Sequence, residues 1–170
     1  RMMISGGIWS SVTARDRSHL DFSGGGYDDD PRISLLNESS MNFSGTTFRL
    51  GLADESTATI LPGSRITATI DVGPQARLLM QGGRFEDAGP AIRNRGEMLM
   101  TAGSLALGGL RSSGYSEIRG GDVSGAPEPI PGSFGYVSET PWNFIAHEMG
   151  LIELYGMNLG EFVNLGVHDS

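Results

Sequence analysis

An alternating pattern of apolar and variable residues recurs along this chain. Seven stretches read as an apolar residue, any residue, a second apolar residue, any residue and then a glycine or alanine: "MMISGG", "LDFSGG", "MNFSGT", "LLMQGG", "MLMTAG", "SEIRGG" and "IELYGM", with Ser116 a poor fit at the first place. The second apolar position falls at Ile4, Phe22, Phe43, Met80, Met100, Ile118 and Leu154, and Ile60 in "TATILPGS" divides the longest interval. Strict alternation is typical of a half-buried strand.

A second alternating stretch precedes most of these predicted strands. Stretches such as "VTARDRSHLDF" and "ISLLNESSMNF" pass through one polar register position before the strand begins. That position is occupied by Asp16, Asn37, Asp54, Pro74, Asn94 or Glu148. We expect Asp16, Asn37, Asp54 and Asn94 to stack along one edge as a ladder of side-chain hydrogen bonds. A line of cation sites at the same edge is the alternative.

Units of similar length that cannot bury an apolar face alone are typical of solenoids, whose coils pair about 4.8 Å apart. The sequence therefore predicts an all-β fold, a single-stranded parallel β-helix of about 18–20-residue coils. A left-handed hexapeptide helix requires an aliphatic residue every six positions, but sixth steps from Ile4 give Ser10, Asp16 and Phe22. We therefore expect a right-handed β-helix, with residues 1–170 as one domain and an irregular insertion around 124–143.

Residues 139–150, "ETPWNFIAHEMG", fit two local structures. Thr140 and Pro141 are typical of a helix start, and Gly150 is typical of a helix end. The repeat frame instead matches "FIAHEMGLIELYGMNL" over its whole length. We therefore predict strand from 144 onward, and a helix over 141–149 is the alternative.

The composition of the chain excludes several classes of structure and of binding partner. The chain has 26 glycines, which favours a turn-rich β-protein, and no cysteine, which excludes a disulfide framework. Its net charge is −8 with no basic patch, so we expect no nucleic-acid partner. No apolar run is long enough for a membrane span.

The stretch "LDFSGGGYDDDP" resembles a binding loop but reads better as a corner of the coil. A phosphate cradle needs a helix after the glycines, whereas an aromatic residue and three aspartates follow here. Asp28, Asp29 and Asp30 are carboxylates that could hold Ca²⁺, although the spacing of a calcium loop is not met. We expect no other cofactor and take a solvated acidic loop as the simpler interpretation.

The sequence offers no recognisable nucleophile motif. Cysteine is absent, no G-x-S-x-G elbow occurs, and His147-Glu148 does not continue as H-E-x-x-H. His19 falls at an outward position of the frame, which indicates a surface role. Carboxylate pairs on an outer face could still act on glycans, and only 61–70 and 124–143 could form the side loops of a cleft.

The frame A-x-D-x-S-x-φ-x-φ-x-G-G-x-φ, with φ apolar, resembles the short repeats of secreted bacterial β-helix proteins, such as those associated with PEP-CTERM sorting signals and autotransporter-like adhesins. The resemblance covers most of 2–123 and 144–159. It implies a right-handed β-helix, export, and an extracellular or cell-surface location. "APEPIPG" at 126–132 is not that sorting signal, because no apolar anchor and basic tail follow.

We therefore expect a non-enzymatic extracellular structural protein of a surface or matrix, whose subunits stack head to tail into a filament. Apolar residues near both ends are the predicted assembly residues: Met2, Met3, Ile4, Ile8, Trp9, Ile152, Leu154, Leu159, Phe162 and Leu165. A carbohydrate-binding or carbohydrate-cleaving β-helix module, with a polysaccharide partner, is the alternative. Ice binding is a weaker one, because T-x-T occurs only at 57–59 and 67–69.

Overall fold

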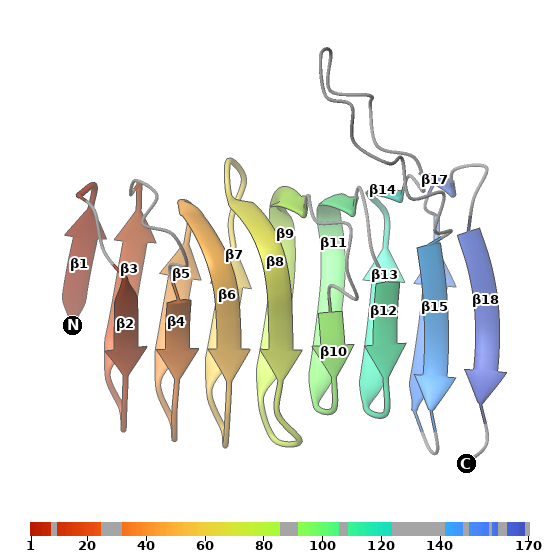
Figure 1. Cartoon of the computed structure of the whole chain (residues 1–170), viewed down its shortest axis with the longest axis horizontal. Coiled ribbons are helices and arrows are strands. Elements are labelled where there is room, and N and C mark those ends of the chain that lie inside the picture. Colours follow the sequence, from red (N-terminus) through yellow and green to blue (C-terminus); the bar gives the residue numbers. More distant parts are fainter. Residues whose placement is uncertain are drawn as a thin grey trace.

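The computed structural model describes residues 1–7, 10–24, 32–85, 92–105, 109–123, 142–147, 150–156, 158–159 and 163–168. Within these ranges every regular element is a β-strand, and the strands pair in parallel. Each circuit of the chain lies beside the previous one, from the N-terminus at one end towards the C-terminus at the other (Figure 1). The molecule is a parallel β-solenoid, which confirms the predicted fold class.

Two long faces and one narrow face make up the solenoid. The first face contains β1 (Met2–Ser5), β3 (His19–Ser23), β5 (Ser40–Phe43), β7 (Thr57–Ile60), β9 (Arg77–Phe85), β11 (Glu97–Leu105), β13 (Tyr115–Arg119) and β16 (Leu151–Tyr155). The second face contains β2 (Ser11–Ala14), β4 (Arg32–Leu35), β6 (Thr46–Leu52), β8 (Arg65–Val72), β10 (Ile92–Asn94), β12 (Gly109–Ser112), β15 (Trp142–His147) and β18 (Val163–His168). The narrow face is formed by the starts of β6 and β8, the ends of β9 and β11, and the short strands β14 (Asp122–Val123) and β17 (Asn158–Leu159).

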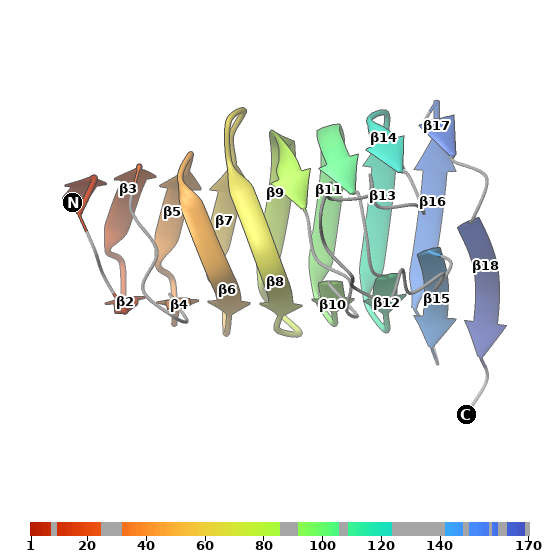
Figure 2. The ribbon, with the colours of Figure 1, turned by 45° about the horizontal axis from the view of Figure 1, so that its top comes forward.

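The hand of the solenoid follows from two views. With the N-terminus at the left, strands of the first face point up at the back, and strands of the second face point down at the front (Figure 1). Turning the top forward moves the second face below the first, which fixes their depth (Figure 2). A chain that rises at the back, crosses forward and descends while advancing to the right follows a right-handed screw, as parallel crossovers generally do.

The predicted inward position forms one column along the first face. The strand register aligns Ile4, Phe22, Phe43, Ile60, Met80, Met100, Ile118 and Leu154. The six interior members are at most 1% exposed, whereas the two end members, Ile4 and Leu154, are partly buried. Residues such as Leu35, Leu52 and Val72 enter the same core from the second face. The core is therefore a continuous apolar stack between the two long faces.

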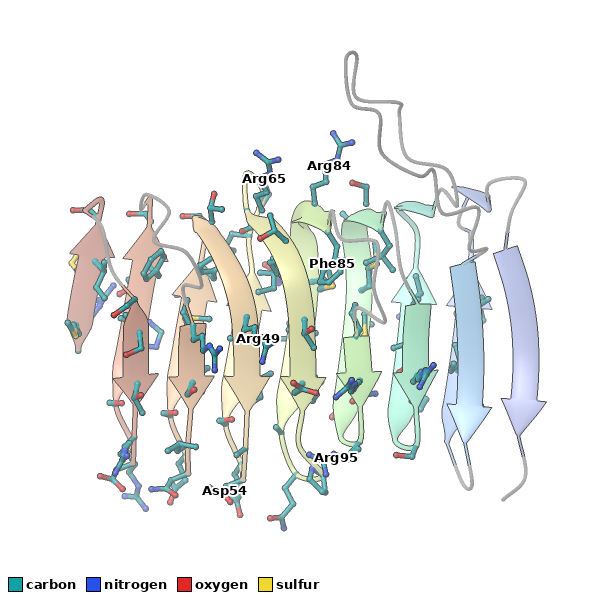
Figure 3. The ribbon with its side chains drawn as sticks, in the orientation of Figure 1. Arg49, Asp54, Arg65, Arg84, Phe85 and Arg95 are labelled. Atoms are coloured by element: carbon teal, nitrogen blue, oxygen red, sulfur yellow. The ribbon has the colours of Figure 1, made fainter. Side chains whose placement is uncertain are left out.

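The polar ladder is present at the turns that join the second face to the first. Asp16, Asn37 and Asp54 all have positive φ, near +55° to +58°, a conformation that Asn and Asp tolerate better than most residues. The Nδ2 of Asn37 donates to Asp16 Oδ1 at 2.8 Å, and the backbone N–H of Asn37 donates to Asp54 Oδ2 at 3.0 Å. Figure 3 shows Asp54 and Arg95 at this edge, with Arg65 and Arg84 at the opposite one.

The prediction that Asn94 continues this ladder is wrong. The turn after β10 has only two residues, 95–96, so Asn94 still lies in the strand, in register with Val72, and is 1% exposed. Its Nδ2 donates to the Tyr115 carbonyl oxygen at 2.6 Å, and its Oδ1 accepts the Gly96 N–H at 3.0 Å. Asn94 therefore closes a tighter turn from inside the coil.

Two further expectations are settled by the strand boundaries. Residues 142–147 form β15, so the strand interpretation is confirmed there and the helix alternative is wrong over those residues. β8 begins at Arg65, so 61–70 is not a side loop. Of the predicted insertion around 124–143, residues 124–141 lie outside the described ranges.

Candidate functional site

The outward side of the first face carries two polar clusters at opposite ends of the solenoid. The histidine cluster consists of Arg1, His19, Asp21, Ser40 and Asn42, from the chain start and strands β3 and β5. The tyrosine–glutamate cluster consists of Tyr115, Glu117, Arg119, Glu153 and Tyr155, from strands β13 and β16. Both arise because alternate residues of parallel strands in register share one face.

The histidine cluster is a hydrogen-bonded network centred on Asp21. Arg1 Nε donates to Asp21 Oδ2 at 2.7 Å, and Asn42 Nδ2 donates to Asp21 Oδ1 at 3.1 Å. His19 Nε2 lies 3.1 Å from the same Oδ1, and His19 Nδ1 lies 2.8 Å from Ser40 Oγ. A carboxylate only accepts, so His19 Nε2 carries the proton, and in the neutral ring Nδ1 accepts from the serine hydroxyl.

Ser40, His19 and Asp21 thus follow the serine–histidine–aspartate order of a hydrolase, which sequence reasoning missed. The ring nitrogens are exchanged relative to the usual triad, where the carboxylate binds Nδ1. The backbone N–H of Ser40 donates to the Ser18 carbonyl oxygen at 2.9 Å, so strand pairing already uses it. The side-chain amide of Asn42 donates to Asp21 Oδ1, so this bond orients the amide towards the carboxylate. We interpret the cluster as a cross-strand structural network.

The stability of this end of the solenoid should depend on pH through the ionisation of Asp21. Hydrogen bonds from Arg1 and then Asn42 lower the pKa of Asp21 from its ordinary 3.8 to about 2. The stabilisation is therefore complete above about pH 4 and is lost as the pH falls towards 2. We expect Asp21→Asn to reduce the fall in the urea midpoint between pH 5 and pH 2.5. Thr59→Asn, outside the cluster, should keep the wild-type dependence, and an unchanged dependence in Asp21→Asn would contradict the assignment.

The tyrosine–glutamate cluster places two carboxylates opposite each other on paired strands. The register aligns Glu117 with Glu153 and Arg119 with Tyr155. Like charges directly opposite each other destabilise a sheet, so the cluster needs donors to offset them. Tyr115 Oη donates to Glu153 Oε2 at 2.8 Å, and Arg119 Nε donates to Glu117 Oε1. The hydrogen bond to Glu153 is the main cause of the raised pKa of Tyr115, so the phenol stays protonated and remains a donor.

An open depression adjoins this cluster at the end of the two strands. It has a volume of about 500 Å³ and is lined, among the described residues, by Arg119, Tyr155 and Gly156. Tyr155 is 52% exposed, and the Glu117 side chain next to Arg119 is only 11% exposed. The arrangement combines a partly accessible aromatic ring, a guanidinium group and carboxylate acceptors, a set suited to binding a small polar ligand.

The repeat frame puts Glu117 and Glu153 at the same variable position, between its two apolar residues, but does not show that the two carboxylates pair. The repeat frame puts Asp21, Asn42, Thr59, Leu79, Leu99, Glu117 and Glu153 in one row, and the strand register confirms that row. The sequence does contain an indication of the site. Two acidic residues that follow each other in this row are expected to lie on adjacent strands, as Glu117 and Glu153 do. The pairing also required β16 to lie directly beside β13, which the structure shows and the repeat frame does not.

The other predicted site residues are placed only in part. Asp28, Asp29 and Asp30 lie outside the described ranges, so the calcium hypothesis stays a prediction. Within the described ranges no group of three or more His, Asp or Glu side chains could hold a metal ion. No helix long and apolar enough to cross a membrane is found in the described part of the chain.

The burial of the predicted assembly residues is described for half of them. Met2 and Met3 are 58% and 74% exposed, and Ile4, Ile152 and Leu154 are partly buried against the core. The remaining members are Ile8, Trp9 and Phe162, which lie outside the described ranges, and Leu159 and Leu165, which lie in β17 and β18.

Comparisons with known proteins do not assign this chain to a family. A scan against protein-family models finds no match, and searches of curated proteins and of solved structures find none either. The functional argument therefore rests on the residues of this chain.

Proposed function

We propose that this chain is a non-enzymatic structural β-solenoid of an extracellular surface or matrix, which associates head to tail into a filament. Its repeats resemble those of secreted bacterial β-helix proteins, and that resemblance supports the location. The observation that carries the proposal is the match between the core columns at the two ends of the first face.

The core columns reach both ends of the first face with the same kind of residue. At β1, Met2 and Ile4 occupy the inward positions that Leu20 and Phe22 occupy one coil later. At β16, the inward positions are held by Ile152 and Leu154, which are still partly exposed. Apolar side chains on both edges can bury against each other, and unpaired strand edges can template a further parallel strand.

Stacking β16 of one copy on β1 of another would continue both columns. Ile152 would cover Met2, and Leu154 would cover Ile4, in the register that the solenoid uses between its own coils. Such a contact joins two different surfaces, so it is heterologous and generates an open filament unless the rotation closes a ring.

Two adjacent methionines provide a matched test of this contact. Met2 points into the column and Met3 points outward, since Met3 aligns with Asp21. We expect the wild-type chain to form particles of growing length in light scattering and filaments in negative-stain electron microscopy. Met2→Gln should abolish them, because it places an amide without a hydrogen-bond partner in the buried column, whereas Met3→Gln, which adds no charge opposite Asp21, should keep them.

Folding should survive both changes, because Met2 and Met3 are exposed in the single chain; circular dichroism checks this. A wild-type chain that stays monomeric at high concentration overturns the proposal. Equal effects of the two substitutions would show that the contact does not follow the core columns.

The non-enzymatic part of the proposal has its own test. The two carboxylates of the tyrosine–glutamate cluster are the described groups best placed to attack a glycosidic bond. We expect no release of reducing ends or unsaturated products from neutral or acidic polysaccharides over a day. Depolymerisation by the wild type that disappears in Glu117→Gln would make the chain a carbohydrate-cleaving enzyme.

A further inference from the structure

We propose that the tyrosine–glutamate cluster and the depression beside it bind a neutral, hydroxyl-rich oligosaccharide. This site uses outward side chains of β13 and β16, whereas the assembly proposal uses the inward side chains of β16, so the two proposals rest on different side chains of that strand.

The acceptor capacity of the cluster is the first argument. Each carboxylate can accept about four hydrogen bonds. Tyr115 supplies one donor to Glu153, and Arg119 supplies one to Glu117. Acceptor positions therefore remain on both side chains, about one strand spacing apart. Vicinal hydroxyl groups of a sugar ring are donors that two such acceptors can bind together.

The burial of Glu117 is the second argument. The residue is 8% exposed although its position points outward, and the other charged members of the cluster are more exposed. A carboxylate held in a partly desolvated place by a guanidinium group forms stronger hydrogen bonds than one in bulk water. Glu117 is thus a preorganised acceptor and not a freely rotating surface charge.

The exposed ring of Tyr155 supplies the apolar contact that a sugar needs. Tyr155 is 52% exposed and lines the depression together with Gly156, which has no side chain and no heavy atom within 4 Å of the place a Cβ would take. The C–H face of a pyranose can pack against the ring while its hydroxyl groups reach the carboxylates along the strand. Arg119, which lies opposite Tyr155 and donates to Glu117, can also donate to ring or hydroxyl oxygens of the sugar.

Charge selects among saccharides. The cluster holds two carboxylates and one guanidinium group, and the whole chain carries a net charge of −8. Uronic-acid and sulfated glycans would be repelled from such a surface. Neutral glycans carry no opposing charge, so the site should prefer them over polygalacturonate.

The experiment uses affinity electrophoresis and calorimetry on the full chain. The probes are soluble mixed-linkage glucan, xyloglucan, galactomannan and arabinoxylan, with polygalacturonate as the acidic probe. We expect at least one neutral glycan to retard the wild type, and Tyr155→Ala and Glu153→Gln each to weaken its binding about tenfold. Tyr155→Phe keeps the ring and should keep most of the affinity.

Thr59→Ala serves as the matched control, because Thr59 lies in the same outward row as Glu153 but on β7, away from the cluster. It should bind as the wild type does. The proposal is overturned if no neutral glycan binds, if only polygalacturonate binds, or if Thr59→Ala weakens binding as much as Tyr155→Ala. Filament formation in Tyr155→Ala should be unchanged, which separates this site from the assembly contact.

Discussion

Phe43→Asp should unfold the solenoid or leave it close to unfolding at room temperature. Phe43 is 0% exposed and lies in the inward column between Phe22 and Ile60. Its ring stacks on that of Phe22 with centroids 5.3 Å apart. A carboxylate there loses this contact and has to be buried without a partner, which costs more than about 4 kcal/mol. That loss is a large part of the roughly 5–15 kcal/mol that stabilises a typical domain.

Far-UV circular dichroism with a thermal melt measures this effect. The matched control is Thr59→Asp, which places the same carboxylate at an outward position of the neighbouring strand and should cost about 1 kcal/mol or less. Asn42→Asp is not a suitable control, although Asn42 also points outward, because its amide donates to Asp21 and a carboxylate would repel it. Equal losses in Phe43→Asp and Thr59→Asp would mean that the inward column is wrongly assigned.

Gly114→Ala should also be strongly destabilising, although the change adds one methyl group to a turn. A Cβ on Gly114 would overlap the Gly96 carbonyl oxygen and would lie 2.6 and 2.7 Å from the carbonyl carbon and oxygen of Arg95. These are backbone atoms of the neighbouring coil, so no side-chain rotation relieves the contact. The N–H of Tyr115 donates to the Gly96 carbonyl oxygen, so shifting the turn also strains strand pairing. We expect a loss of roughly 3 kcal/mol, the upper part of the range for overpacking.

Urea unfolding measures this loss as a shift of the midpoint. Gly51→Ala is the control, because Gly51 lies in the second face and the nearest atom to its Cβ would be the Ile33 carbonyl oxygen at 4.0 Å. Its midpoint should move by the equivalent of less than about 0.5 kcal/mol. If Gly114→Ala were as stable as Gly51→Ala, the coils at this edge would have to lie further apart than the structure shows.

The lengths of the turns before the first face explain why the prediction for Asn94 was wrong. The carbonyl oxygens of Ser18, Ser39, Ser56, Ala76, Gly96 and Gly114 each accept the first N–H of the next strand on the first face. Four-residue turns such as 15–18 leave room for serine or alanine, whereas the two-residue turns 95–96 and 113–114 bring backbones into contact and require glycine. Counting two residues back from Gly96 therefore gives a buried strand residue, Asn94, where the same count from Ser18 gives Asp16.

The sequence by itself determined the inward column and therefore the fold. From Ile4 to Ile118 the alternating pattern repeats every 17 to 21 residues, and it can bury its apolar members only if the coils stack in that register, since a slip of one residue would expose them all. The same pattern determined the polar edge at Asp16, Asn37 and Asp54, because their turns have equal length. These features are local and periodic, so the order of residues is enough to specify them.

Only the tertiary structure decided which outward side chains meet. Ser40 is hydrogen-bonded to His19, which lies 21 positions away in the sequence. Glu153 accepts a hydrogen bond from the hydroxyl of Tyr115, which lies 38 positions away. The separation between Tyr115 and Glu153 includes 124–143, where the sequence departs from the repeat frame. The repeat therefore could not tell whether β16 or another strand would lie beside β13. Outward residues carry no burial pattern that fixes their neighbours, and their contacts depend on the length of every turn between them. The candidate saccharide site, unlike the core, is therefore a product of how the coils stack.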